Sequence, residues 1–181
     1  MRIIAGTLRS RQIRAPAGSD IRPTSDKLRE TLFNVLAPRI ESARFLDLYA
    51  GTGAVAIEAL SRGARDAVLV ESSKRAARTA RENLEALGLS DQALLIEDDV
   101  PRALRQMEEV FDIVFLDPPY SLHGQYEASL TLLSLLPLLA PNAVVIAEHD
   151  KRHTLYESYG KLKRYRQLAQ GDATLSFYAA T

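Results

Sequence analysis

The amino-acid sequence predicts a doubly wound α/β domain, and three observations lead to that prediction. Short apolar runs rich in valine, isoleucine and leucine alternate with longer segments whose apolar residues follow helical spacing. A glycine turn joins the first of these internal runs to the segment after it. Near the end, two strand-like runs flank Gly171 and Asp172, which is typical of an antiparallel hairpin. Strands spaced by helices form a mostly parallel sheet covered on both faces.

The composition is that of one ordinary globular domain. The chain has 181 residues, 46% hydrophobic and 25% charged, so it is long enough to bury a core. It has no cysteine, which excludes disulfides and thiolate metal sites, and His149 and His153 lack the spacing of metal ligands, so we expect no metal. The N-terminus lacks the apolar core of a signal peptide, and prolines interrupt the apolar stretch 130–147. We therefore expect no membrane span and a cytoplasmic protein.

The first elements precede the alternating pattern. The runs RIIAG and RQIRAP are expected to form a small basic β-hairpin around a Gly-Thr-Leu turn. The run DIRP should be extended, because a residue before proline avoids the helical conformation. Thr24 or Ser25 can then cap a helix that ends near Pro38, with apolar residues at helical spacing from Leu28 to Leu36.

The remaining elements alternate as a doubly wound domain requires. Strands are expected at 44–48, 67–71, 93–97, 113–116, 143–147, 163–167 and 174–179. Helices are expected at 54–62, 73–87, 100–108, 125–136 and 151–159. The expectation is therefore a mostly parallel seven-stranded sheet with an antiparallel last strand, helices on both faces and the small N-terminal hairpin.

Charge is unevenly distributed, although the net charge is zero. The residues before Pro23 include one acidic side chain, Asp20, and five arginines: Arg2, Arg9, Arg11, Arg14 and Arg22. A basic arm of this kind is typical of contact with nucleic-acid phosphates, although charge that protects a sheet edge would look the same. We divide the chain into an RNA-binding extension, 1–23, and a second domain, 24–181.

The stretch LDLYAGTGAVAIEAL contains a turn that points to a nucleoside. Gly51, Gly53 and Ala56 fit the G-x-G-x-x-[GA] fingerprint of a nucleoside-binding strand, turn and helix. Glu71 follows Gly51 by about 20 residues, where a carboxylate accepts hydrogen bonds from ribose hydroxyls. Glycine spacing does not distinguish a nicotinamide dinucleotide from S-adenosylmethionine. Asp47 favours the second, because it would repel a pyrophosphate and attract a cationic amino group.

The tetrapeptide Asp117-Pro118-Pro119-Tyr120 decides between the two cofactors. It follows the expected strand 113–116, so it lies at the same end of the sheet as the glycine turn. The Asp117 carboxylate and the Pro118 carbonyl can accept the two N–H groups of an exocyclic amine, and the prolines fix the backbone there. Tyr120 offers a ring on which a base can stack. This chemistry indicates methyl transfer to an amino group, with Asp117 as acceptor of its proton and no metal.

At this point the sequence resembles a known family. The segments LDLYAGTGAVAIEALSRGA, VESS and LDPPY resemble the class I S-adenosylmethionine-dependent methyltransferases, which have a Rossmann-like fold. The opening RIIAGTLRSRQIRAP, the segment IRPTSDKLRETLFNVL and the closing GDATLSFY are similar to the RsmD-type family. Those enzymes methylate the N2 amine of one guanine in bacterial 16S ribosomal RNA. The resemblance covers nearly the whole chain.

The resemblance implies roles for individual residues. Glu71 would hold the ribose of S-adenosyl-L-methionine, and either Asp98 or Asp99 would meet the adenine amine. The methionine part would contact Asp47, Gly51 and Gly53, and Asp117, in the motif Asp117–Tyr120, would also bind the cofactor. Over the site would lie Arg22, Pro23 and Thr24, while the RNA phosphates would contact Arg2, Arg9 and Arg11. Independently of the resemblance, the place of Tyr49 in the glycine turn leaves two interpretations open: it packs over the cofactor or fills the strand end.

Three alternatives remain open from the residues. The first is another amino-group methyltransferase, acting on adenine N6 or on protein glutamine, although glutamine enzymes usually have asparagine in place of Asp117. The second is a nicotinamide-dependent oxidoreductase, which would leave the Asp117–Tyr120 motif unexplained. The third is a catalytically silent RNA-binding module, which would not need Asp117 and Glu71 together. For the main hypothesis we expect 16S ribosomal RNA in a small-subunit assembly intermediate as partner, because so little basic surface requires a preformed shape to select one base.

Overall fold

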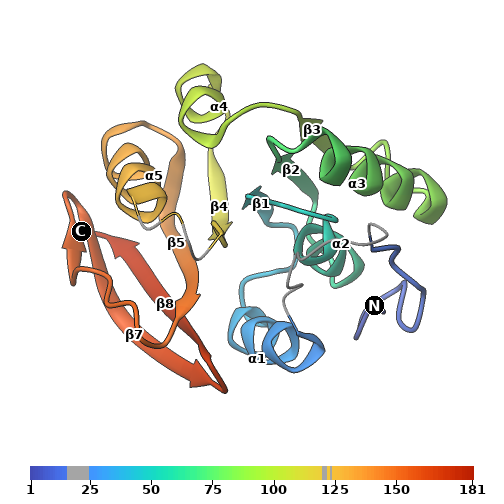
Figure 1. Ribbon diagram of the computed structural model, residues 1–181, viewed down its shortest axis with the longest axis horizontal. Helices are drawn as coiled ribbons and strands as arrows, with labels where there is room; N and C mark the ends of the chain where they lie inside the picture. The colour runs from blue at the N-terminus through green and yellow to red at the C-terminus, as the bar shows by residue number, and fades with distance from the viewer. Residues whose placement is uncertain (16–24, 120–121, 123) are drawn as a thin grey trace.

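A single mixed sheet forms the centre of the protein (Figure 1). The computed structural model describes residues 1–15, 25–119, 122 and 124–181. The strand order is β3-β2-β1-β4-β5-β8-β7-β6, with β3 to β5 parallel and β8, β7 and β6 each antiparallel to the preceding neighbour. The strands are β1 (Arg44–Leu48), β2 (Asp66–Val70), β3 (Ala93–Ile96), β4 (Phe111–Leu116), β5 (Leu139–Asp150), β6 (Ser158–Tyr159), β7 (Leu162–Gln170) and β8 (Ala173–Ala180). The mostly parallel sheet with an antiparallel last strand is confirmed, and the two-residue β6 adds an eighth strand to the seven predicted.

Within the described residues, five helices cover the two faces of this sheet. They are α1 (Asp26–Leu36), α2 (Ala54–Ser61), α3 (Lys74–Leu87), α4 (Val100–Gln106) and α5 (Gly124–Leu135). One hydrophobic cluster joins α1, α2 and α3 to one face, and a second joins α4 and α5 to the other. Figure 1 shows α1 and α2 on one side of the strands and α4 and α5 on the opposite side. The predicted cover on both faces is therefore confirmed.

Ser25, one of the two residues expected as the cap of α1, is the N-cap of this helix. The Ser25 hydroxyl accepts a hydrogen bond from the Leu28 amide at 3.1 Å, which satisfies one of the free N–H groups of the first turn. The apolar face of the helix buries Leu32, Phe33 and Leu36 against the sheet. Thr24, the alternative cap, lies outside the described residues.

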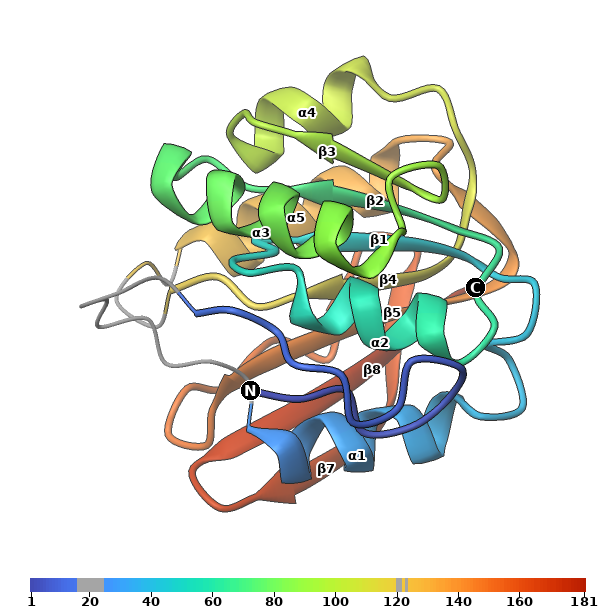
Figure 2. The same cartoon turned by 90° about the vertical axis from the view of Figure 1, so that its right-hand side faces the viewer.

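The first 15 residues form a hairpin with a minimal ladder. One antiparallel bridge joins Arg2 to Gln12, and the Ile3 amide donates to the Arg11 carbonyl at 2.9 Å. Ile3 and Ile13 are buried in the same cluster as α1 and α2. We call residues 1–15 the N-terminal segment; Figure 2 shows it lying over α2 and beside α1. Its contacts with the helices, rather than its own ladder, hold it in place.

The expectation of a helix at 151–159 is wrong. The Asp150 carboxylate instead accepts hydrogen bonds from the amide and the side chain of Arg152, at 2.8 and 2.9 Å, and this fixes a turn. The chain then extends into β6, which pairs with β7. Leu155 and Tyr159 are both buried, and their spacing of four fits a strand period of two as well as a helical period. Sequence periodicity alone is therefore ambiguous here.

Candidate active site

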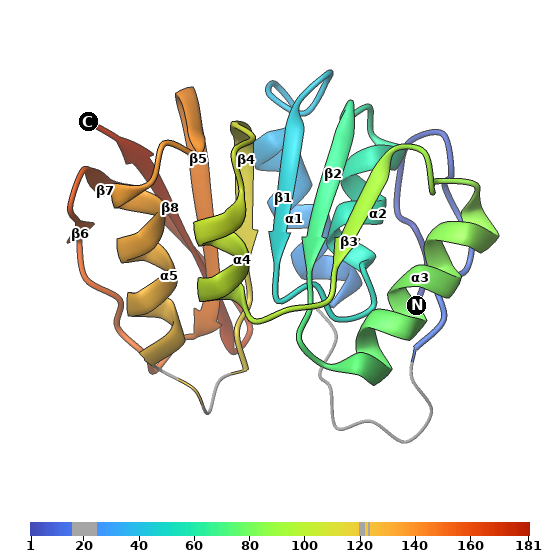
Figure 3. The same ribbon diagram turned by 90° about the horizontal axis from the view of Figure 1, so that it is seen from above.

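Four parallel strands end level with one another. In the register of the sheet, Ile96, Val70, Leu48 and Leu116 lie in one row across β3, β2, β1 and β4. The residues that follow them therefore meet at the same edge, which we call the carboxyl edge; Figure 3 shows β1, β2 and β4 pointing to it. Strand β1 lies where the strand order reverses, between β2 and β4. Ligands of doubly wound sheets bind at this position.

The glycine turn follows β1 at this edge. The backbone is left-handed at Tyr49, Gly51 and Gly53, with φ of 64°, 56° and 79°. A Cβ on Gly53 would lie 3.0 Å from the Leu69 side chain, so glycine is needed there for both conformation and packing. A Cβ on Gly51 would meet no atom within 4 Å. The turn is thus packed from below and open above Gly51, which leaves room for a ligand against its backbone.

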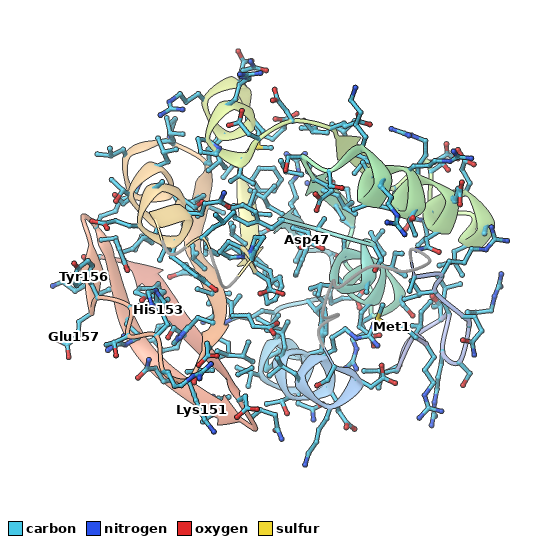
Figure 4. All side chains as sticks on the ribbon, viewed as in Figure 1. Met1, Asp47, Lys151, His153, Tyr156 and Glu157 are labelled. Carbon is cyan, nitrogen blue, oxygen red and sulfur yellow. The ribbon has the colours of Figure 1, made fainter. Side chains whose placement is uncertain are left out.

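Asp47 lies beneath this turn and is 1% exposed. Its Oδ2 accepts a hydrogen bond from the Ala56 amide, in the first turn of α2, at 3.0 Å. Figure 4 shows the side chain in the interior, next to α2. Burial raises the pKa of Asp47 to about 7, against the lowering effect of the Ala56 amide, and the charge of Glu71 raises it further. The carboxyl group therefore holds the start of α2 against β1.

Glu71 joins the end of β2 to the glycine turn. Its Oε2 accepts from the Gly51 amide at 2.8 Å, and its Oε1 accepts from the Ser73 amide at 2.8 Å. The side chain is partly exposed. The carboxylate thus joins the glycine turn to the start of the segment that leads into α3.

The two acidic candidates after β3 differ in their surroundings. Asp99 caps α4 by accepting from the Arg102 amide at 3.0 Å, while Asp98 accepts from the Asp99 amide at 2.8 Å. Burial raises the pKa of the Tyr49 phenol, and the hydrogen bond to the Ser129 hydroxyl, at 2.8 Å, lowers it. The negative charge of Asp99 raises the pKa of Tyr49 as well. Tyr49 and both aspartates therefore lie at the carboxyl edge.

The Asp117-Pro118-Pro119 segment lies on the other side of the glycine turn. The Asp117 amide donates to the Leu48 carbonyl, the last of β1, at 3.4 Å. Pro118 is buried and Pro119 exposed. The Tyr126 hydroxyl, from α5, lies 3.4 Å from the Pro118 carbonyl and 3.0 Å from the Glu148 carbonyl, so it holds this segment to β5. Tyr120, the expected stacking residue, lies outside the described residues.

The described arginines of the N-terminal segment are exposed, and three of them contact α1 or α3. The Arg2 side chain pairs with Asp26 at 3.6 Å, Arg11 donates to the Ala86 carbonyl at 3.4 Å, and Arg14 pairs with Glu82 at 4.0 Å. Arg9 is also exposed. Arg22 lies outside the described residues.

Sequence reasoning missed a basic surface next to this segment. The outer side of α3 exposes Lys74, Arg75, Arg78 and Arg81, and Arg78 shares the Glu82 carboxylate with Arg14. The helix begins at the carboxyl edge, three residues after Glu71. The signal is present in KRAARTAR, whose cations recur at helical spacing, but the apolar positions from which the helix is predicted do not reveal it.

No metal centre or membrane-spanning helix is found in the part of the chain that the structure describes. The described residues contain no group of three or more histidine, aspartate or glutamate side chains that could hold a metal ion. None of the described helices is both long and apolar enough to cross a membrane. His149 is buried, its Nδ1 and Nε2 lying 3.0 Å from the Asp150 carbonyl and 2.9 Å from the Ser176 hydroxyl. Because a carbonyl only accepts, Nδ1 carries the proton and His149 joins β5 to β8.

Known proteins resemble this chain over almost its full length. A family model described as Conserved hypothetical protein 95 matches residues 1–179. Ribosomal RNA small subunit methyltransferase D of Escherichia coli is 34% identical over 178 residues, 98% of this chain and 89% of that protein. YlbH of Bacillus subtilis is 37% identical over 181 residues, 98% of both chains. The solved structure of yhhF from E. coli has a TM-score of 0.89 at 34% identity and covers 99% of this chain and 97% of that chain.

These similarities agree with the topology of the sheet. The fold is the Rossmann-like fold of class I S-adenosylmethionine-dependent methyltransferases, and it extends to methyltransferase structures of much lower sequence identity. The N-terminal segment, the glycine turn and the closing hairpin all fall within the matched residues. The chain therefore belongs to the family described as Conserved hypothetical protein 95, the RsmD-type methyltransferases.

Proposed function

We propose that this protein transfers a methyl group from S-adenosyl-L-methionine to the exocyclic N2 amine of one guanine in 16S ribosomal RNA. Its relatives include an enzyme named as a small-subunit ribosomal RNA methyltransferase. The observation that carries the proposal is the level placement of the glycine turn after β1 and the Asp117-Pro118-Pro119 segment after β4. A cofactor on the turn would present its methyl group towards the acceptors of this segment.

The residues around the turn fit this cofactor. The open backbone at Gly51 would accommodate the methionine part, and Glu71, which accepts from the Gly51 amide, would bind the ribose hydroxyls. Asp98 and Asp99 are the two candidates for the adenine amine. Asp47 supports the turn from below, and its negative charge, when ionised, favours a cationic amino group above it. None of these residues is a cation that could pair with the pyrophosphate of a nicotinamide dinucleotide.

The chemistry of the chain is positioning and proton acceptance. When bound, S-adenosyl-L-methionine supplies an electrophilic methyl group on a sulfonium. The Asp117 carboxylate and the Pro118 carbonyl would accept the two N–H groups of the guanine N2 amine, which directs the nitrogen lone pair towards the methyl carbon. Transfer to the nitrogen would leave S-adenosylhomocysteine, and Asp117 would accept the proton that the amine loses. Tyr126 holds the Pro118 carbonyl in place, and Tyr120 would stack on the base.

The exposed cations indicate where the RNA would lie. We assign to its phosphates the arginines of the extension 1–23 (Arg2, Arg9, Arg11, Arg14 and Arg22) together with Lys74 and Arg75 at the start of α3. Among the described residues the two groups are contiguous, because Arg14 and Arg78 share Glu82, and α3 begins at the carboxyl edge. This strip leads from the N-terminal segment to the reaction centre. Since it is small, we propose that the substrate is an assembly intermediate of the small subunit, whose shape selects the base.

Binding and transfer assays test the proposal in two steps. Calorimetry should show binding of S-adenosylhomocysteine and none of nicotinamide dinucleotide, which separates a methyltransferase from an oxidoreductase. Tritium from labelled S-adenosyl-L-methionine should then enter unmodified small subunits faster than protein-free 16S ribosomal RNA. Absence of S-adenosylhomocysteine binding would exclude the proposed reaction, and equal rates on the two substrates would exclude the assembly intermediate.

A further inference from the structure

We propose that Asn83 is a positioning residue that couples the N-terminal segment to the glycine turn, so that RNA contact and cofactor binding influence each other. The inference rests on the proposed function, because it assigns the two surfaces to RNA and to S-adenosyl-L-methionine. Asn83 lies on α3 and is 2% exposed. Its printed hydrogen bonds within the described residues go to backbone groups, those of Arg14 and Thr52.

The side-chain amide of Asn83 bonds to both surfaces at once. Its Oδ1 accepts from the Arg14 amide at 2.8 Å, and its Nδ2 donates to the Arg14 carbonyl at 3.0 Å. The same Nδ2 donates to the Thr52 carbonyl at 3.1 Å. Thr52 lies between Gly51 and Gly53 in the glycine turn. One buried group therefore fixes the backbone of the N-terminal segment and the backbone of the turn.

An amide is well suited to this position, because it provides an acceptor and two donors in one plane. Replacing it by an apolar group would leave the buried Thr52 carbonyl and the partly buried Arg14 backbone groups without these partners, and the loss at Thr52 is the more costly. The turn would then be free to shift by the small distances that matter for a bound cofactor. Movement of the N-terminal segment on RNA would act on the turn through the same amide.

Ser61 offers a matched control on a neighbouring helix. Its hydroxyl accepts from the Leu8 amide at 3.0 Å and donates to the Ala5 carbonyl at 2.6 Å. It is also buried, at 1% exposed, so it holds the same N-terminal segment with bonds of similar kind. Within the described residues, the Ser61 hydroxyl bonds to the N-terminal segment and not to the glycine turn. Its substitution thus removes two bonds to the segment and leaves the bonds of Asn83 to Arg14 and Thr52 in place.

The test compares Asn83→Ala, Asn83→Asp and Ser61→Ala in the full chain, with thermal unfolding to establish that each is folded. Calorimetry measures the Kd of S-adenosylhomocysteine, and initial rates of methyl transfer give KM for unmodified small subunits. Both Asn83 variants should weaken S-adenosylhomocysteine binding about tenfold and raise KM for the subunits. Ser61→Ala should raise only KM for the subunits, with cofactor Kd within about twofold of the natural protein.

Two results would overturn the coupling, and they differ from failure of the proposed function. If the folded Asn83→Asp protein bound S-adenosylhomocysteine as tightly as the natural protein, the amide would not position the turn. If Ser61→Ala weakened cofactor binding as much as Asn83→Ala, the effect would be a general loss of stability. If the natural protein itself bound no S-adenosylhomocysteine, the proposed function would fail and the coupling with it.

Discussion

At the scale of single residues, Asp117 is the group on which the proposed chemistry depends most. Asp117→Ala removes the carboxylate acceptor of the amine but leaves the glycine turn, Glu71 and the aspartates after β3 in place. We expect methyl transfer to fall at least about a hundredfold, while S-adenosylhomocysteine binds with little change. Single-turnover assays and calorimetry measure the two effects separately. Transfer at the natural rate in this variant would remove Asp117 from the mechanism.

Asp47 gives a pH dependence whose direction follows from its burial. Because the pKa is raised to about 7 in the folded protein, from 3.8 ordinarily, the folded state binds the extra proton between those values. The free energy of unfolding should therefore fall as the pH rises from about 4 to about 7, by the contribution of this group. Asp47→Asn should remove that contribution, so the variant gains stability relative to the natural protein as the pH rises. Urea unfolding at a series of pH values measures it, and parallel curves for the two proteins would contradict the assignment.

The sequence predicts the place of some site residues and not of others. The glycine spacing and the Asp117-Pro118-Pro119 motif have a local meaning, because strand order places both at one edge of the sheet. The bonds from Glu71 to Gly51 and from Asp47 to Ala56 depend on side-chain directions that no spacing fixes. Asn83 carries no signal at all, since a single asparagine in an amphipathic helix reads as an ordinary polar residue.

At the scale of elements, the two glycines of the turn before α2 differ in their surroundings: Gly53 is packed against a neighbouring side chain and Gly51 is not. Gly53→Ala adds a Cβ 3.0 Å from Leu69 at a left-handed φ, so we expect a loss of about 1–2 kcal/mol in the free energy of unfolding. Gly51→Ala meets no neighbouring atom, so its cost is limited to the backbone strain of about 1 kcal/mol. Because that Cβ would enter the proposed cofactor space, Gly51→Ala should weaken S-adenosylhomocysteine binding.

Urea unfolding and calorimetry on the two glycine variants measure these effects. The proposed position of the cofactor predicts that Gly51→Ala loses more affinity than its small loss of stability explains. Unchanged affinity in Gly51→Ala would place the cofactor elsewhere.

The elements also show where sequence patterns stop being decisive. Long amphipathic helices and buried parallel strands are predicted to within a few residues, because periodicity and burial agree there. The predicted helix at 151–159 is wrong. Two buried residues four apart fit both a helical and a strand period, so the pattern does not distinguish them. The turn at Asp150 and the pairing of β6 with β7 determine the extended conformation. Two-residue β6 is too short for any period to reveal.

At the scale of the whole molecule, the exposed cations should control RNA affinity. Lys74→Ala combined with Arg75→Ala should weaken RNA binding and lower the slope of log K against log salt by about one for each phosphate that the variant no longer neutralises. Lys163→Ala is the control, because Lys163 is exposed on β7 near the amino end of β5, away from the carboxyl edge. Filter binding across a salt series measures both. Equal slopes for the double variant and the control would exclude the start of α3 from the RNA surface.

The central claim is the identity of the methylated atom, and one measurement addresses it most directly. Purified small ribosomal subunits that lack the modification are incubated with the protein and isotopically labelled S-adenosyl-L-methionine, and the digested RNA and proteins are analysed by mass spectrometry. The account predicts label in N2-methylguanine at a single position of 16S ribosomal RNA, and none with the Asp117→Ala variant. Label at adenine N6, in a ribosomal protein, or in no product at all would contradict it.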